Sequence, residues 1–192
     1  MNSAVGISRI TLAHVVVIIA LFAGAGCASV QEKIPFVRGR YRDRNEGFSL
    51  LYDLATKQRN VDKILVLKHV NARTESEIKE IAQLFHQAQE EFDSFARQDS
   101  SLNFQATHLP ALEEKTRDSI QSTTTKDLLF STGKDFELRL LLTQVQALNY
   151  ASHLANVLRD KDYNRTRKSF LSEFSKQCDQ HHQKVMQLLS SL

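Results

Sequence analysis

The sequence is poor in the two residues that most often interrupt helices. It has only 6 Gly and 2 Pro among 192 residues. A fold of many short strands needs many turns, and turns draw heavily on these residues, so their scarcity argues against such a fold and favours long helices. No internal repeat is present, and the length allows one domain with a hydrophobic core.

Signals of common catalytic chemistry are also missing. The sequence has no Gly-x-Ser-x-Gly elbow, no Gly-rich phosphate loop and no Cys-x-x-Cys pair. It also lacks Glu-x-x-His, the pair that di-iron helical bundles use. The formal net charge of +3 is too small to indicate nucleic-acid binding. We therefore predict a protein that is not an enzyme, holds no cofactor and binds no nucleic acid.

The first of the 2 cysteines stands at the end of an apolar leader. Arg9 precedes the apolar run Leu12–Ala23, whose length of about 12 residues fits a signal peptide and falls short of the ~20 that span a bilayer. Small residues then lead to Cys27. This pattern resembles a bacterial lipoprotein signal, in which the chain is cut before an acylated cysteine and the acyl chains hold it at a membrane. We predict a signal peptide over residues 1–26 and lipidation of Cys27.

Two other interpretations of the leader stay open. Lipoprotein signals usually carry Leu three residues before the cysteine, where this sequence has Gly24. Cleavage after Ala25, at an A-x-A site, would remove the leader without lipidation, and an uncleaved anchor is disfavoured by length. Ala28 is not the Asp that retains many lipoproteins at the inner membrane. We therefore expect a lipid-anchored protein of the cell envelope, at the outer membrane and facing the periplasm.

A basic, polar segment follows the cysteine and extends to Gly47. We interpret residues 27–47 as a tether. It is either a solvated linker or a contact for anionic lipid or cell-wall polymer, because clustered Lys and Arg near a membrane gain ~1 kcal/mol each. The basic residues that could make this contact are Lys33, Arg38, Arg40, Arg42 and Arg44.

Residues 48–192 are predicted to form an all-α, up-and-down bundle of four or five helices. The central helix covers Asp135–Asp160 and is long, apolar and free of Gly and Pro. Its apolar stripe is too wide for a single partner, so other helices should surround it. The stripe consists of Phe136, Leu140, Leu141, Ala147, Leu148, Ala151, Leu154, Ala155 and Leu158.

The other helices are predicted from periodicity and capping signals. Thr74 and Glu77 form a capping box that starts a helix running to Arg97, and Thr132 with Asp135 caps the central helix. A first helix is expected over Phe48–Val70, with a break at Asn60 as an alternative. Another is expected over Pro110–Thr124, followed by an apolar plug at Leu128–Phe130. The last helix is expected over Tyr163–Leu189, and its inner face holds Tyr163, Phe170, Phe174, Cys178, His181, Val185 and Leu188.

A few polar residues fall on apolar faces and could carry chemistry. Cys178 and His181, three apart on the last helix, could form a zinc or copper site together with Glu137. A metal site usually needs three or four converging ligands, so we favour structural roles. Glu137 would then gain from its helix dipole, Gln144 would hydrogen-bond across the bundle, His181 would join two helices, and Cys178 would act as a small buried hydrophobe. His86 and His153 fall on polar faces and are expected at the surface.

Several short motifs lie in the second half of the chain, namely Leu109-Pro110, Phe130 to Gly133, Phe136-Glu137, Gln144 and His181. Together they resemble a family of bacterial outer-membrane proteins of unknown function that has a ferritin-like four-helix fold. The resemblance covers about Phe48 to Leu189. The family often has a His one turn after the position of Gln144, where this sequence has Leu148. The resemblance implies a ferritin-like bundle and no defined activity.

Three functions are compatible with these features. The first is an envelope lipoprotein whose bundle binds another envelope protein or a cell-wall polymer. The second is a ferritin-like metal protein. The third is a carrier of an apolar ligand, suggested by the aromatic residues of the helix that starts near Thr74.

Overall fold

The structure, a computed structural model, describes residues 35–104 and 109–192, so the predicted signal peptide, Cys27 and Lys33 lie outside the described residues. In these two ranges the chain forms helices and no strand, which confirms the predicted all-α fold. None of the described helices has both the length and the apolar character that crossing a membrane requires. In chain order the elements are α2 (Pro35–Gln58), the 3₁₀ helix η1 (Val61–Val66), α3 (Ala72–Gln98), α4 (Ala111–Phe130), α5 (Gly133–Lys161) and α6 (Arg165–Ser190).

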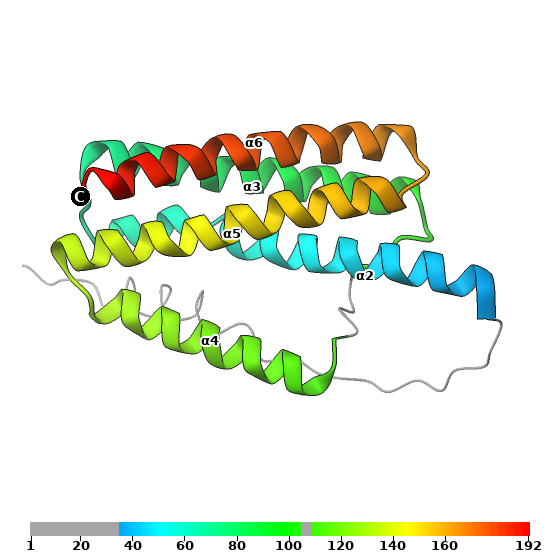
Figure 1. The fold of residues 1–192 in the computed structure, drawn as a ribbon, viewed down its shortest axis with the longest axis horizontal. Coiled ribbons are helices and arrows are strands. Elements are labelled where there is room, and N and C mark those ends of the chain that lie inside the picture. The colour runs from blue at the N-terminus through cyan, green and yellow to red at the C-terminus, as the bar shows by residue number, and fades with distance from the viewer. Residues whose placement is uncertain (1–34, 105–108) are drawn as a thin grey trace, which may run out of the picture. The chain divides into compact units, whose positions relative to one another are not determined.

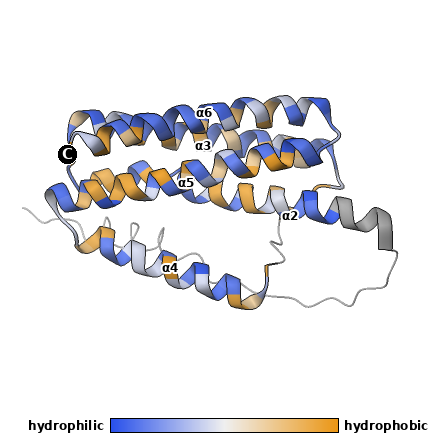
Figure 2. Ribbon diagram, in the orientation of Figure 1, coloured by the Kyte–Doolittle hydropathy of each residue, from blue (hydrophilic) through white to orange (hydrophobic). Residues whose placement is uncertain are grey.

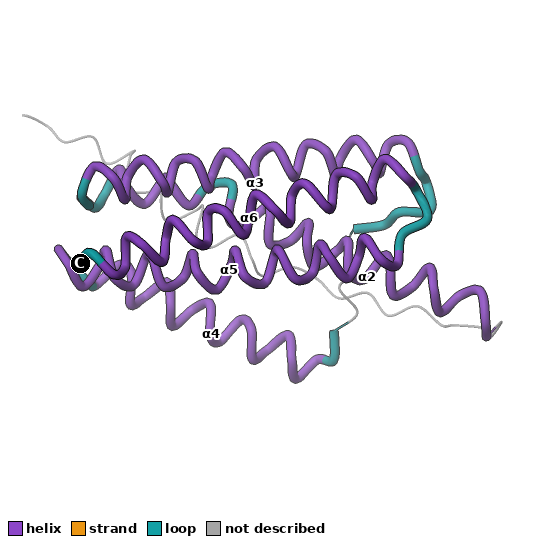
Figure 3. Tube along the Cα trace, turned by 45° about the horizontal axis from the view of Figure 1, so that its top comes forward, coloured by secondary structure: helices purple, strands orange, loops and turns teal. Residues whose placement is uncertain are grey.

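Four α-helices form a ring around the core. Helix α2 packs against α3, α3 against α6, α6 against α5, and α5 against α2. Successive α-helices alternate in direction along the chain, as expected of an up-and-down bundle (Figure 1). Helix α4 has no buried residue and lies outside the ring against α5 (Figure 3). Because α4 leads the chain back between α3 and α5, these two helices run in the same direction, and neighbours in the ring are antiparallel.

Helix α5 has the central role that its apolar stripe predicts. It packs against α2, α4 and α6, and apolar residues recur along its whole length (Figure 2). Burial of a Leu or Phe side chain contributes about 1.5–3 kcal/mol, so this stripe is a main source of stability. Leu154 is partly buried. The other predicted residues are all buried: Phe136, Leu140, Leu141, Ala147, Leu148, Ala151, Ala155 and Leu158.

Aromatic rings fill the part of the core between α2, α3 and α6. The ring of Phe92 lies 6.2 Å from that of Phe48, 5.5 Å from that of Phe170 and 6.4 Å from that of Phe174, each in an edge-to-face arrangement. Such pairs add about 0.5–1.5 kcal/mol to the gain from burial. Phe92 is one of the aromatic residues that suggested an apolar-ligand carrier, and its ring packs against rings of α2 and α6 in the core.

Gly47 allows α2 to approach α5 closely. A methyl group at this position would overlap the Leu158 side chain, which is itself buried. Glycine costs about 1 kcal/mol in a helix interior relative to alanine, while overpacking a core costs about 1–3 kcal/mol. We therefore expect Gly47→Ala to lower the free energy of unfolding by up to about 2 kcal/mol, measured by urea denaturation.

A Leu158→Ala background separates these two effects. With the leucine removed, Gly47→Ala should become neutral or stabilising, because only the gain in helix propensity remains. An equal loss of stability in both backgrounds would show that the close contact with Leu158 is not the reason for the glycine.

The predicted tether is helical over much of its length. Helix α2 begins at Pro35, so the helical domain starts 13 residues before the predicted boundary at Phe48. Pro is favoured in the first turn of a helix, and Arg is a good helix former. Arg38 and Arg40 lie in α2, and Arg42 is exposed and pairs with Glu46 at 2.6 Å.

The tether interpretation is wrong for Arg44, which is buried and part of the fold. Its Nη2 donates a hydrogen bond to Ser101 Oγ at 3.0 Å, and the neighbouring Asn45 side chain donates to the Ser101 carbonyl at 2.8 Å. These contacts attach α2 to the loop that follows α3. Asn60, in contrast, breaks the helix as the alternative interpretation predicted, since α2 ends at Gln58 and η1 follows.

Two apolar predictions near helix ends are wrong. The predicted plug Leu128–Phe130 forms the last turn of α4, which continues past Thr124. Leu128 packs partly buried against the core, but Phe130 is 84% exposed. Tyr163 lies in the turn before α6 and is 68% exposed, because that helix begins only at Arg165.

A buried ion-pair network joins the ends of three helices. Arg167 in α6 binds Asp162 through two hydrogen bonds of 2.5 and 2.8 Å, and its third contact, with Asp99 after α3, is 2.8 Å. Burial opposes the charge on Asp162, but the hydrogen bonds from Arg167 and from the Asn164 backbone outweigh it and lower the pKa. The pKa of Asp99 is also lowered, first by Ser101 and further by Arg167. We call Arg167, Asp162 and Asp99 the buried ion-pair network.

Candidate functional site

The three metal-ligand candidates from the sequence bind different partners. Glu137 accepts hydrogen bonds from Thr74 Oγ1, at 2.5 Å, and from the Asn71 side chain, both at the start of α3. Cys178 is fully buried, and burial raises the pKa of its thiol well above the usual range, as expected of a small buried hydrophobe. His181 contacts Glu77 on α3, which confirms its predicted role between two helices. The proposed ligand set of Glu137, Cys178 and His181 is therefore not assembled.

Gln144 is buried but does not hydrogen-bond across the bundle as predicted. Its Nε2 donates to Thr143 Oγ1 on the same helix at 3.1 Å, and its Oε1 has no hydrogen-bond partner among the described residues. The expected surface histidines are confirmed, since His86 and His153 are both exposed. None of these residues forms a site.

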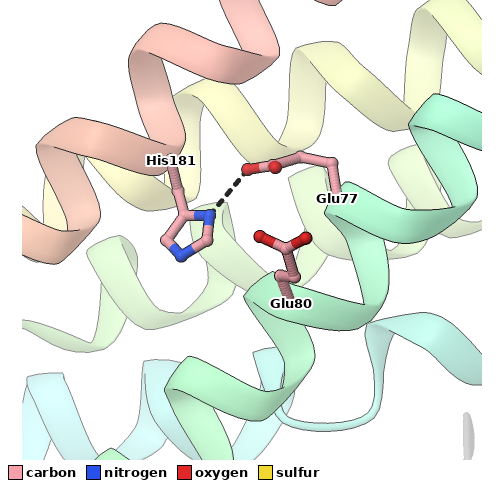
Figure 4. A group of neighbouring side chains, drawn as sticks. All are labelled: Glu77, Glu80 and His181. Carbon is pink, nitrogen blue, oxygen red and sulfur yellow. Dashed lines mark hydrogen bonds and ion pairs between the residues drawn. The ribbon is translucent and has the colours of Figure 1, made fainter.

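A different set of charged side chains meets where α3 and α6 pack together. Glu77 and Glu80 lie one turn apart on α3, and His181 and Lys184 lie one turn apart on α6. His181 Nδ1 is 2.6 Å from Glu77 Oε1, and Lys184 Nζ is 2.8 Å from Glu80 Oε2 and 3.4 Å from Glu77 Oε2. The imidazole and the two carboxylates face one another (Figure 4). We call these four residues the carboxylate–histidine cluster.

The electrostatics of the cluster favour a charged Glu80 carboxylate paired with a charged Lys184. The hydrogen bond from Lys184 lowers the pKa of Glu80, against a smaller opposing effect of burial. The same hydrogen bond raises the pKa of Lys184, and Glu77 adds to this effect. Glu77 is only 5% exposed, so its carboxylate depends on these neighbours in place of water.

The cluster escaped the sequence analysis because the start of α3 was placed three residues too late. Asn71 is the N-cap, and its side chain accepts a hydrogen bond from the Thr74 amide at 2.9 Å. The predicted capping box is therefore wrong, and Glu77 lies in the second turn with its side chain at the interface with α6. Its spacing to Ile81 and Leu84, of 4 and 7 residues, is the signal that places it on the inner face.

A half-open groove lies beside the cluster, between the same two helices. Its volume is about 330 Å³. The floor is apolar, and carboxylates and amides line the rim. We call it the α3–α6 groove; Leu84, Ala88, Phe170 and Phe174 line the floor, and Gln87, Glu90, Glu91, Glu173 and Gln177 line the rim.

These features define a class, namely an all-α helical bundle that carries a carboxylate–histidine cluster and an acidic-rimmed groove on one helix interface. Comparisons with protein-family models, with curated proteins and with solved structures found no match for this chain. The resemblance to an outer-membrane family with a ferritin-like fold therefore stays a prediction.

Proposed function

We propose that this chain is a non-enzymatic binding module of a bacterial cell envelope, held at the periplasmic face of the outer membrane by lipid on Cys27. The leader that ends in Ala25-Gly26-Cys27 supports the anchor. The long connection between α3 and α5, which carries α4, supports the ferritin-like class, because one long crossover is typical of that class.

The observation that carries the binding role is the α3–α6 groove. An apolar floor with a charged rim suits a protein segment that presents apolar side chains flanked by charges of opposite sign. The rim carries Glu90, Glu91 and Glu173 and no basic residue among its lining. The partner segment should therefore be a basic amphipathic helix of another envelope protein, and a cell-wall polymer fits the apolar floor less well.

Site-specific photocrosslinking in intact envelopes tests this proposal. A photoreactive residue at Gln87, on the rim, should give one crosslinked species of defined mass. The same residue at Gln146, an exposed glutamine on α5, is the matched control and should give none. Because the rim attracts a basic partner, adding Glu173→Lys should reduce the Gln87 crosslink at least about threefold. Equal crosslinking at both positions, or no effect of Glu173→Lys, contradicts recognition at the groove.

A further inference from the structure

We infer that Glu77, Glu80 and His181 form a binding site for a divalent transition-metal ion, with zinc as the best-fitting example. One donor atom from each residue can be chosen so that all three lie within 4.8 Å of one another. Zinc binds carboxylate oxygen and imidazole nitrogen at about 2.0–2.2 Å, so donors around one ion lie about 3–4 Å apart. Small rotations of the Glu80 and His181 side chains would therefore bring these three donors into contact with one ion.

The type and placement of the donors suit this ion. Two carboxylates and one imidazole form a set that zinc, iron and manganese accept, and three protein ligands leave a position for water. The donors are held by two different helices, which fix their spacing. Glu77 is buried and cannot move far, whereas Glu80 and His181 are more exposed and can adjust.

Lys184 already marks the position of a cation. Its ammonium contacts both Glu80 and Glu77, so the two carboxylates attract one positive charge in this structure. The two carboxylates can carry two negative charges, which a divalent ion that replaces the ammonium would balance. The Lys184 side chain is 49% exposed on a flexible stem, so it can turn to solvent when the metal ion binds.

Zinc titration of the full-length protein, purified in detergent and treated with chelator, tests this site. We expect one zinc ion per chain, detected by competition with a chromophoric chelator and by calorimetry. Loss of an outer-shell partner costs about 10- to 100-fold in affinity, so loss of a ligand in Glu80→Gln or His181→Asn should cost at least about 100-fold. Glu80 is half exposed, so Glu80→Gln is expected to fold, which circular dichroism checks.

Two further variants distinguish a metal site from an interhelical ion pair. Lys184→Met should bind zinc about three- to fivefold more tightly, because it removes a weakly held competing cation. His86→Asn is the matched control, because it removes a histidine of α3 that lies outside the proposed site. His86 forms only an exposed pair with Glu90, at 3.6 Å. Its zinc affinity should equal that of the unchanged protein. Absence of stoichiometric zinc, an equal loss in His86→Asn, or weaker binding in Lys184→Met would each overturn the inference.

Discussion

Replacing Arg167 with methionine is expected to lower the free energy of unfolding by about 3–5 kcal/mol. Arg167 and Asp162 are both buried, with side-chain exposures of 6% and 0%. Removal of the guanidinium leaves the Asp162 carboxylate without its cation and without two hydrogen bonds, in a place that water cannot reach. The contact with Asp99, which connects α6 to the end of α3, is lost as well.

Chemical denaturation at pH 7 measures this loss. Arg165→Met is the matched control, because Arg165 is exposed two residues earlier on the same helix and should change stability by less than about 0.5 kcal/mol. A similar small change for Arg167→Met would mean that the buried ion-pair network adds no net stability.

The pH dependence of the free energy of unfolding tests the buried ion-pair network in a second, independent way. In the unchanged protein the pKa values of Asp162 and Asp99 are lowered on folding. The contribution of these two carboxylates to the free energy of unfolding is therefore complete above the ordinary Asp pKa of 3.8. It is lost as the pH falls through their lower pKa values in the folded protein. In Arg167→Met, burial is opposed only by the backbone hydrogen bonds from Asn164 and Tyr163, so the pKa of Asp162 rises above its value in the unchanged protein and the carboxyl is protonated more readily. The gap in stability between the two proteins should therefore narrow as the pH falls from 7 towards 4, which denaturation at several pH values measures.

The sequence predicted the elements that depend on local periodicity. The stripe of α5 lies in the core as expected, because apolar residues at helical spacing have few other ways to leave water. Errors occurred where two local signals competed. Asn71 and Thr74 are both good N-cap residues, and the choice of Thr74 removed Glu77 from the list of inward-facing residues.

The candidate site could not be predicted because it depends on contacts between distant parts of the chain. Glu77 and His181 are 104 residues apart, and Arg167 and Asp99 are 68 apart. Periodicity shows that His181 faces inward, but it does not show which helix or which turn lies opposite. The ring order places α6 beside α3, so His181 meets Glu77, whereas Glu137 of α5 reaches Asn71 and Thr74 at the start of α3.

Replacing Cys27 with serine should release the protein from the membrane fraction. Serine has nearly the same size but offers no thiol for acylation. Acyl chains contribute about 0.8 kcal/mol per buried CH₂ group, and stable anchoring takes two such signals, so loss of the lipid removes essentially all of the membrane affinity. Fractionation together with radiolabelled palmitate measures both effects. The unchanged protein should carry label and sediment with membranes, whereas Cys27→Ser should carry none and remain in the soluble fraction.

Cys178→Ala is the control for this result, because it removes the other cysteine, whose thiol is fully buried in the core. It should keep both the label and the membrane association. The mass of the mature N-terminus then separates the alternatives: lipidation at Cys27 leaves an acylated first residue, whereas cleavage after Ala25 leaves an unmodified chain beginning at Gly26. If Cys27→Ser sediments with membranes as firmly as the unchanged protein and neither carries label, the anchor is not a lipid. The proposed placement at the outer membrane then has no physical basis, while the groove and the zinc site would still be tested by their own experiments.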